Sequence, residues 1–100
     1  WIRVCALEDI PRLGSRVVRR EGADDLALFR NADDEVFALV DRCPHRGGPL
    51  SQGIVFGRSV ACPLHGWEFD LRTGACLTVP TRPVRSHPVR VVDGKVEVAV

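Results

Sequence analysis

The stretch that decides the fold reads Cys43-Pro44-His45-Arg46-Gly47-Gly48-Pro49-Leu50, and a second stretch, Cys62-Pro63-Leu64-His65-Gly66-Trp67, echoes it. Each stretch places one cysteine and one histidine on the same short piece of backbone, with a proline directly after the cysteine. Thiolate and imidazole are the protein ligands that suit soft and borderline transition metals. The two stretches therefore predict a metal centre held between two loops.

The order of the ligands favours two metal ions over one. The first cysteine and histidine are separated by one residue and the second pair by two, so thiolate and imidazole alternate along the chain. Two irons bridged by sulfides fit this order, because Cys43 and Cys62 can bind one iron while His45 and His65 bind the other. This is the ligand set of a Rieske [2Fe-2S] centre.

The pattern Cys-x-His followed by Cys-x-x-His, with a proline after each cysteine and glycine near the histidines, resembles the Rieske iron-sulfur family. The resemblance extends over nearly the whole chain. It implies an all-β fold of small antiparallel sheets or a sandwich, with a cluster-binding subdomain made of two loops. It also implies one Rieske [2Fe-2S] cluster bound by Cys43, His45, Cys62 and His65. We expect a single domain over residues 1–100, with the cluster-binding portion at about residues 42–70.

Two other interpretations of the ligands are weaker. A structural zinc site has the right ligand types, but it usually takes its cysteines from one knuckle and its histidines from a separate element. A cysteine nucleophile with a histidine base needs only one residue of each kind, so the second pair would have no role.

Size and charge restrict the activity further. One hundred residues suffice for one modest core and leave no room for a second domain with a mononuclear iron, so we expect an electron-transfer component of an oxidoreductase without catalytic residues of its own. A formal charge of +1 argues against nucleic acid or an anionic membrane as partner, and favours proteins. Without a long apolar run or a leader, the domain is expected to be soluble and cytoplasmic, with the true start of the protein upstream of Trp1.

Three further residues need an assignment. Cys5 and Cys76 lie in apolar, strand-like contexts and are predicted to be small buried hydrophobic residues, and a disulfide between them is not expected in a reducing cytoplasm. His87 precedes Pro88 far from the two loops, so it is predicted to be exposed or hydrogen-bonded and not a metal ligand.

Alternating apolar and polar residues predict short strands along the rest of the chain. Turn-forming residues at 31–34, 57–58 and 93–94 predict three hairpins, and Asp93-Gly94 favours a type I′ turn. Prolines and glycines exclude regular structure from residues 42–53, and three prolines should carry residues 80–88 across the surface. The expected strands cover residues 1–7, 15–20 with arginines facing solvent, 26–30, 35–40, 54–61 as a hairpin, 67–70, 89–92 and 95–100.

The residues between and beside the ligands indicate a low-potential centre. High-potential members of the resembled family link their loops by a disulfide and donate hydroxyl groups to the sulfur atoms, whereas Gly48, Leu64 and Trp67 occupy those places here. We therefore expect a midpoint of about −150 to 0 mV, which falls at alkaline pH as the imidazoles lose protons. Electrons should pass through His45 and His65, framed by an apolar docking patch of Pro44, Gly47, Pro49, Pro63, Leu64 and Trp67.

Two kinds of electron carrier remain. Residues 4–11 and 41–65 resemble the small subunit of assimilatory NAD(P)H-dependent nitrite reductase, which implies a sirohaem large subunit as partner and a role in nitrate assimilation. The run Gly66-Trp67-Glu68-Phe69-Asp70 is more similar to free-standing Rieske ferredoxins. The alternative is thus the ferredoxin component of a ring-hydroxylating dioxygenase system, with a flavin reductase and an oxygenase as partners. The chain has no nicotinamide or flavin motif.

Overall fold

Two strands in the middle of the molecule organise the fold. In the computed structural model, which describes residues 1–44, 47–64 and 66–100, strand β3 (Leu26–Arg30) pairs with β4 (Val36–Val40) as the predicted hairpin. Every residue from 26 to 29 is buried, so β3 is covered on both faces. Because side chains alternate between the faces of a strand, β3 contributes to two separate cores.

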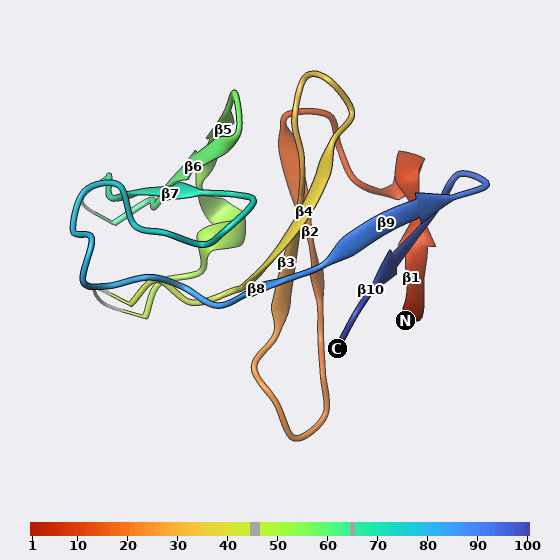
Figure 1. The fold of residues 1–100 in the computed structure, drawn as a ribbon, viewed down its shortest axis with the longest axis horizontal. Helices are drawn as coiled ribbons and strands as arrows, with labels where there is room; N and C mark the ends of the chain where they lie inside the picture. The colour runs from red at the N-terminus through yellow and green to blue at the C-terminus, as the bar shows by residue number, and fades with distance from the viewer. Residues whose placement is uncertain (45–46, 65) are drawn as a thin grey trace.

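The strands of the described residues form three antiparallel sheets, which confirms the expected all-β class (Figure 1). The first sheet has the order β1-β10-β9, the second β2-β3-β4-β8 and the third β5-β6-β7. The remaining strands are β1 (Ile2–Ala6), β2 (Gly14–Val18), β5 (Ile54–Phe56), β6 (Ser59–Ala61), β7 (Glu68–Asp70), β8 (Ser86–His87), β9 (Val89–Val92) and β10 (Lys95–Val98).

The second sheet is a shared middle layer, with the third sheet on one side and the first on the other (Figure 1). Ala27 and Phe29 pack into the core toward the third sheet, which also contains Phe69. Leu26 and Leu28 pack into the core toward the first sheet. Cys43 and Cys62 belong to the first of these cores, so the predicted ligand loops rest on the middle layer.

The predicted hairpins form as expected. Asp93 and Gly94 both have positive φ, 51° and 75°, which is the type I′ geometry, and they join β9 to β10. Gly57, with φ of 56°, lies at the turn between β5 and β6. The chain then leaves β6 at Ala61, directly before Cys62.

One segment predicted to be irregular contains a short regular element. Within residues 42–53, Leu50–Gln52 form a single 3-10 turn, η2, because Asp41 accepts hydrogen bonds from the backbone N–H and the hydroxyl of Ser51 (2.7 and 2.9 Å). A similar 3-10 turn, η1 (Leu7–Asp9), follows β1.

The proline-rich segment 80–88 was also predicted wrongly as a purely surface path. Its Val84 is buried and donates a hydrogen bond to Gly74 O (2.8 Å), and Ser86–His87 add strand β8 to the edge of β4. Proline removes only its own N–H, so the residues between the prolines remain free to pair. Strand β2 also ends earlier than predicted, at Val18.

Cys76 is buried and His87 is hydrogen-bonded, as predicted, whereas Cys5 is only partly buried. All four cysteines are free, Cys76 is buried in one core, and Cys5 packs against the other. His87 Nδ1 is hydrogen-bonded to Ala99 O at 3.1 Å. In the described part of the chain, no helix is long and apolar enough to cross a membrane.

Candidate metal centre

The fold brings the two predicted ligand cysteines together. Cys43 follows β4 and Cys62 follows β6, and the two thiols are hydrogen-bonded to each other. Their residues are 0% and 2% exposed, so the pair is shielded from solvent. Two free, adjacent thiols in an apolar pocket are a donor set that fits one iron of a binuclear cluster.

The first ligand loop is closed by backbone hydrogen bonds. The N–H of Cys43 donates to Gly48 O (2.7 Å), and the N–H of Gly47 donates back to Cys43 O (2.7 Å). Gly47 has a φ of 71°, in the left-handed region that a residue with a β-carbon rarely adopts. The loop therefore depends on glycine at position 47 to turn back on its cysteine.

The second loop repeats this construction. The N–H of Cys62 donates to Trp67 O (2.7 Å), and the N–H of Gly66, with a φ of 68°, donates to Cys62 O (3.1 Å). In both loops the cysteine bonds to the residue five positions later, and the glycine four positions later bonds back to the cysteine. The two loops thus share one backbone design, although the spacing from cysteine to histidine differs by one residue.

The protein environment holds Cys62 in its protonated form. The pKa of its thiol is raised to about 11, chiefly by burial and then by the hydrogen bond with the Cys43 thiol, while the backbone N–H of Leu64 acts in the opposite direction. Because a metal binds the thiolate, loading must release this proton, and the positive charge of the iron compensates the cost of a buried anion.

The two predicted histidine ligands, His45 and His65, lie outside the described residues. Among the described residues no group of three or more histidine, cysteine and acidic side chains comes together. The assignment of the histidines therefore remains a prediction.

The residues of the predicted apolar patch differ in their exposure. Pro44 is half-buried, whereas Pro49, Pro63 and Leu64 are exposed, so the last three are accessible to a partner. Trp67 packs against the core that contains both cysteines, which agrees with a shielding role. Gly47 is exposed as well.

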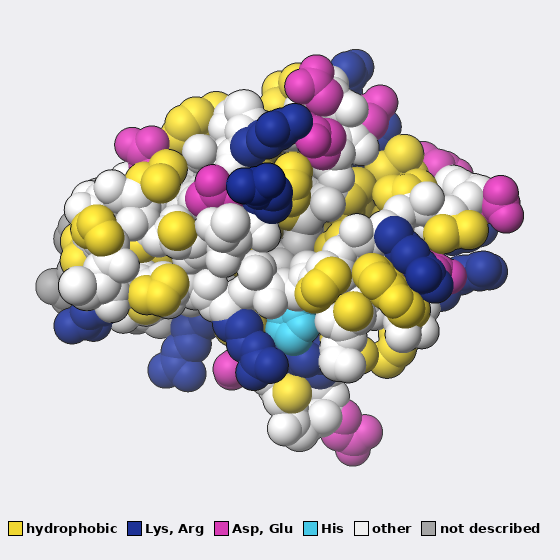
Figure 2. All heavy atoms as spheres, viewed as in Figure 1, with side chains coloured by type: hydrophobic (Ala, Val, Ile, Leu, Met, Phe, Trp, Pro, Cys, Tyr) yellow, Lys and Arg dark blue, Asp and Glu magenta, His cyan; other side chains and the backbone are white. Residues whose placement is uncertain are grey.

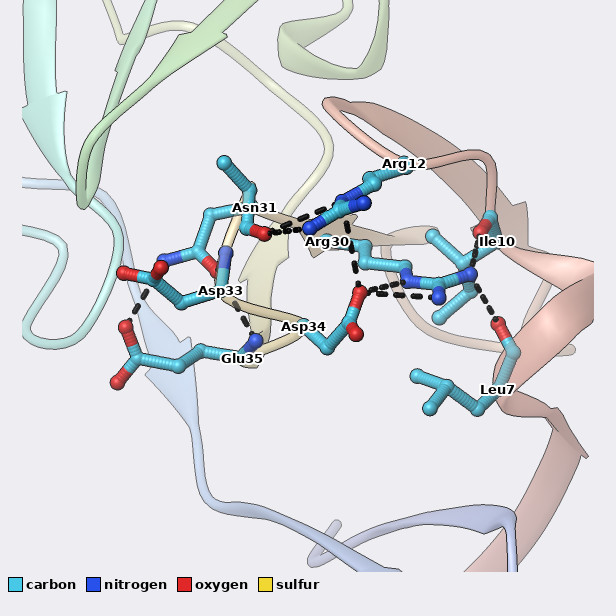
Figure 3. Close-up of polar contacts among 9 residues, drawn as sticks. Leu7, Ile10, Arg12, Arg30, Asn31, Asp33, Asp34 and Glu35 are labelled. Carbon is cyan, nitrogen blue, oxygen red and sulfur yellow. Dashed lines mark hydrogen bonds and ion pairs between the residues drawn. The ribbon is translucent and has the colours of Figure 1, made fainter.

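A buried asparagine ties the third sheet to the middle layer, and the sequence pattern did not reveal it. Asn31 is 1% exposed and accepts hydrogen bonds from the N–H groups of Asp33 (3.0 Å) and Glu35 (2.9 Å) (Figure 3). Its amide donates to Glu35 Oε1 (2.9 Å) and to Gly57 O (3.1 Å) at the β5–β6 turn. Asparagine is common in turns, so nothing in the sequence pattern indicated this reach across 26 residues.

Glu35 extends the same link. Its carboxylate pairs with Arg58 beside Gly57, with 3.0 Å between Nε and Oε1. The hydrogen bond from Arg58, followed by that from Asn31, lowers the pKa of Glu35 below its ordinary value. The β5–β6 hairpin, which delivers Cys62, is therefore fixed to the β3–β4 turn by polar contacts.

Arg30, at the end of β3, links the β3–β4 turn to the segment near the N-terminus. Its guanidinium donates to Ile10 O (3.1 Å) and Leu7 O (3.4 Å) and pairs with Asp34 (2.9 Å) (Figure 3). Arg12 donates to the carbonyl of Ala32 in the same turn. These contacts place η1 against the end of the central hairpin.

Comparisons with known proteins agree on one family for this chain. The model of the Rieske-like [2Fe-2S] domain matches residues 1–99. A 3-phenylpropionate/cinnamic acid dioxygenase ferredoxin subunit from Photorhabdus laumondii is 42% identical over 99 residues, which are 97% of this chain and 91% of that protein.

Solved structures of two kinds share the fold. A chain from the complex of reduced oxygenase and oxidized ferredoxin in carbazole 1,9a-dioxygenase is 36% identical, with a TM-score of 0.87 over 98% of this chain and 100% of that one. A Mycobacterium tuberculosis chain assigned as an NADH-dependent nitrite reductase small subunit is 31% identical, with a TM-score of 0.91 over 100% of this chain and 94% of that one.

Proposed function

This chain belongs to the family of Rieske-like [2Fe-2S] domains, and from that premise we propose that it is the ferredoxin component of a ring-hydroxylating dioxygenase system. When bound, the Rieske cluster of such a domain takes up and releases one electron at a time. In the proposed system a flavin reductase supplies these electrons, and the oxygenase component consumes them.

One observation carries this proposal: the 42% identity to a dioxygenase ferredoxin subunit extends over 97% of this chain and 91% of that subunit. The match therefore extends far beyond the ligand loops in both chains. The likeness to a chain from an oxygenase and ferredoxin complex supports the same role. These relatives favour the dioxygenase ferredoxin over the nitrite reductase subunit that the resemblance in residues 4–11 and 41–65 first suggested.

We also propose that Cys43, His45, Cys62 and His65 hold the cluster within a single domain, with the cluster-binding portion at about residues 42–70. The adjoining buried thiols of Cys43 and Cys62 support the sulfur half of this set. The loops close around the cysteines and exclude water, and the N–H of Leu64 is directed at the Cys62 sulfur. Such N–H groups stabilise the extra negative charge of a reduced site.

The small subunit of a nitrite reductase is the second candidate. The TM-score of 0.91 to the Mycobacterium tuberculosis chain favours it, although the identity is only 31%. Both candidates are one-electron carriers and differ in the partner they serve.

Reconstitution with each partner separates the two candidates. The purified holo-chain is added either to the reductase and oxygenase of a 3-phenylpropionate dioxygenase, with NADH and 3-phenylpropionate, or to a sirohaem nitrite reductase large subunit with nitrite. We expect the chain to restore substrate oxidation in the first assay and the Cys62→Ala variant to fail there. Restoration of nitrite reduction alone would overturn the dioxygenase proposal.

A further inference from the structure

The small net charge conceals a separation of charge along the chain. Residues 42–85, which include both ligand loops, contain six arginines and only two acidic residues, Glu68 and Asp70. Residues 1–41 contain six basic and nine acidic residues. In the view of Figure 2, Lys and Arg side chains gather along the lower edge of the part that holds the third sheet. The end of the molecule that carries the metal centre is therefore the basic end.

A groove on this end adjoins the metal centre. It has a volume of about 450 Å³, and Cys43 and Pro44 form part of its wall. Two cations, Arg42 and Arg85, line it together with one acidic residue, Asp24. The other lining residues are Val40, Gly47, Pro83 and Val84.

The positive charges of both groove arginines are accessible to a partner. A β-carbon on Gly47 would lie 3.5 Å from Arg42 Nε, so the Arg42 guanidinium lies against the first ligand loop. Within the described residues neither Arg42 nor Arg85 forms an ion pair, whereas Arg30, Arg58 and Arg90 do. Both residues are exposed, so a partner can approach their charges.

We propose that this groove docks an acidic segment on the surface of the redox partner. This inference rests on the proposed function, and it adds that the docking surface of the redox partner is acidic. Arg42 and Arg85 supply the attraction, while Pro44 and Pro83 supply apolar contact next to the electron-transfer site. Attraction of this kind accelerates encounter at low salt and weakens as ions screen it.

Small redox probes of opposite charge test the surface without the partner. Ferricyanide, an anion, takes one electron from the dithionite-reduced chain and becomes ferrocyanide, and tris-phenanthroline cobalt(III), a cation, takes one electron in the same way. We expect ferricyanide oxidation to slow by about tenfold as salt is raised from low to high concentration, and the cobalt reaction to accelerate.

Charge-removing variants locate the effect. The double variant Arg42→Gln/Arg85→Gln should lose most of the salt dependence with ferricyanide. Arg16→Gln/Lys95→Gln is the matched control, because Arg16 on β2 and Lys95 on β10 are both exposed and their loss changes the net charge by the same two units. Equal salt dependence in the wild type and the Arg42→Gln/Arg85→Gln variant, or an equal effect of Arg16→Gln/Lys95→Gln, would overturn the proposal.

A binding measurement gives a readout that does not depend on electron transfer. Isothermal titration calorimetry with a decaglutamate peptide should show binding to the wild-type holo-chain that weakens at least about fivefold in the double variant. No binding, or salt-sensitive self-association of the wild type that the double variant abolishes, would overturn the proposal, and the latter would make a second copy the occupant. Because peptide and probes replace the partner, failure to drive an oxygenase would contradict the proposed function alone.

Discussion

Leu64 lies against Gly48 across the two ligand loops, so closely that a β-carbon on residue 48 would be 2.6 Å from Leu64 Cδ1. These are the two positions at which the resembled high-potential proteins carry the cysteines of a loop-linking disulfide. The structure confirms that the positions adjoin. Here an apolar contact, and not a covalent bond, joins the loops.

This contact leads to a prediction for the midpoint potential. We expect a value in the lower part of the Rieske range, about −150 to 0 mV, because neither a disulfide nor a hydroxyl donor at positions 48, 64 and 67 stabilises the reduced state. A redox titration followed by electron paramagnetic resonance gives the value. A midpoint above about +100 mV would contradict the prediction.

Loss of a proposed ligand should remove the iron. Cys62→Ala is expected to purify without the two irons and two acid-labile sulfides of the wild type, because one iron then has a single thiolate. The control is Cys76→Ala, which removes another buried free cysteine that lies outside the proposed ligand set. Iron and acid-labile sulfide are measured in both variants. A Cys62→Ala protein with full iron and sulfide content would refute the ligand assignment.

Asn31→Ala should destabilise the whole domain. The substitution leaves Gly57 O and two backbone N–H groups without their side-chain partner, and we expect a loss of about 2 to 3 kcal/mol in the free energy of unfolding. Asp33→Ala is the control, because the exposed Asp33 takes part in this network through its backbone N–H. Urea unfolding of both variants measures the difference, and equal midpoints would show that the link contributes little.

Glu35 should make stability depend on pH in the acidic range. Its pKa in the folded chain is lowered, first by Arg58 and then by Asn31, so its carboxylate stabilises the fold above the unfolded value of about 4.3. That contribution is lost as the pH falls through the folded value. In Arg58→Gln, a carbon-detected NMR titration should place the pKa of Glu35 closer to its ordinary value. Arg90→Gln removes an arginine that pairs with Glu97 on the first sheet and should leave Glu35 unchanged.

Gly74→Ala should destabilise the domain more than an equivalent change elsewhere. Gly74 has a φ of 78°, and a β-carbon there would lie 2.0 Å from Val84 O, so backbone would have to move. We expect a loss of more than about 3 kcal/mol. Gly22→Ala shares the positive φ, 74°, but meets nothing within 4 Å, and should cost only about 1 to 2 kcal/mol. Thermal unfolding of the pair separates steric overlap from backbone strain.

Local patterns predicted the parts of the fold that depend on neighbouring residues. The Asp93-Gly94 turn and the β3–β4 hairpin form as expected, because turn residues and strand alternation act over a few positions. The same logic failed for residues 80–88, since Ser86 and His87 pair with a strand more than forty residues away. Nothing in the proline-rich composition specified that partner.

The sequence by itself determined the chemistry of the centre, because the identity and spacing of Cys43, His45, Cys62 and His65 allow few metal sites other than a binuclear one. Only the tertiary structure decided that β3 is buried on both faces, that Asn31 reaches Gly57, and that Arg42 and Arg85 line one groove. The physical reason is distance along the chain. Ligand type is a property of single residues, whereas burial, polar links and surface charge arise where remote segments pack together.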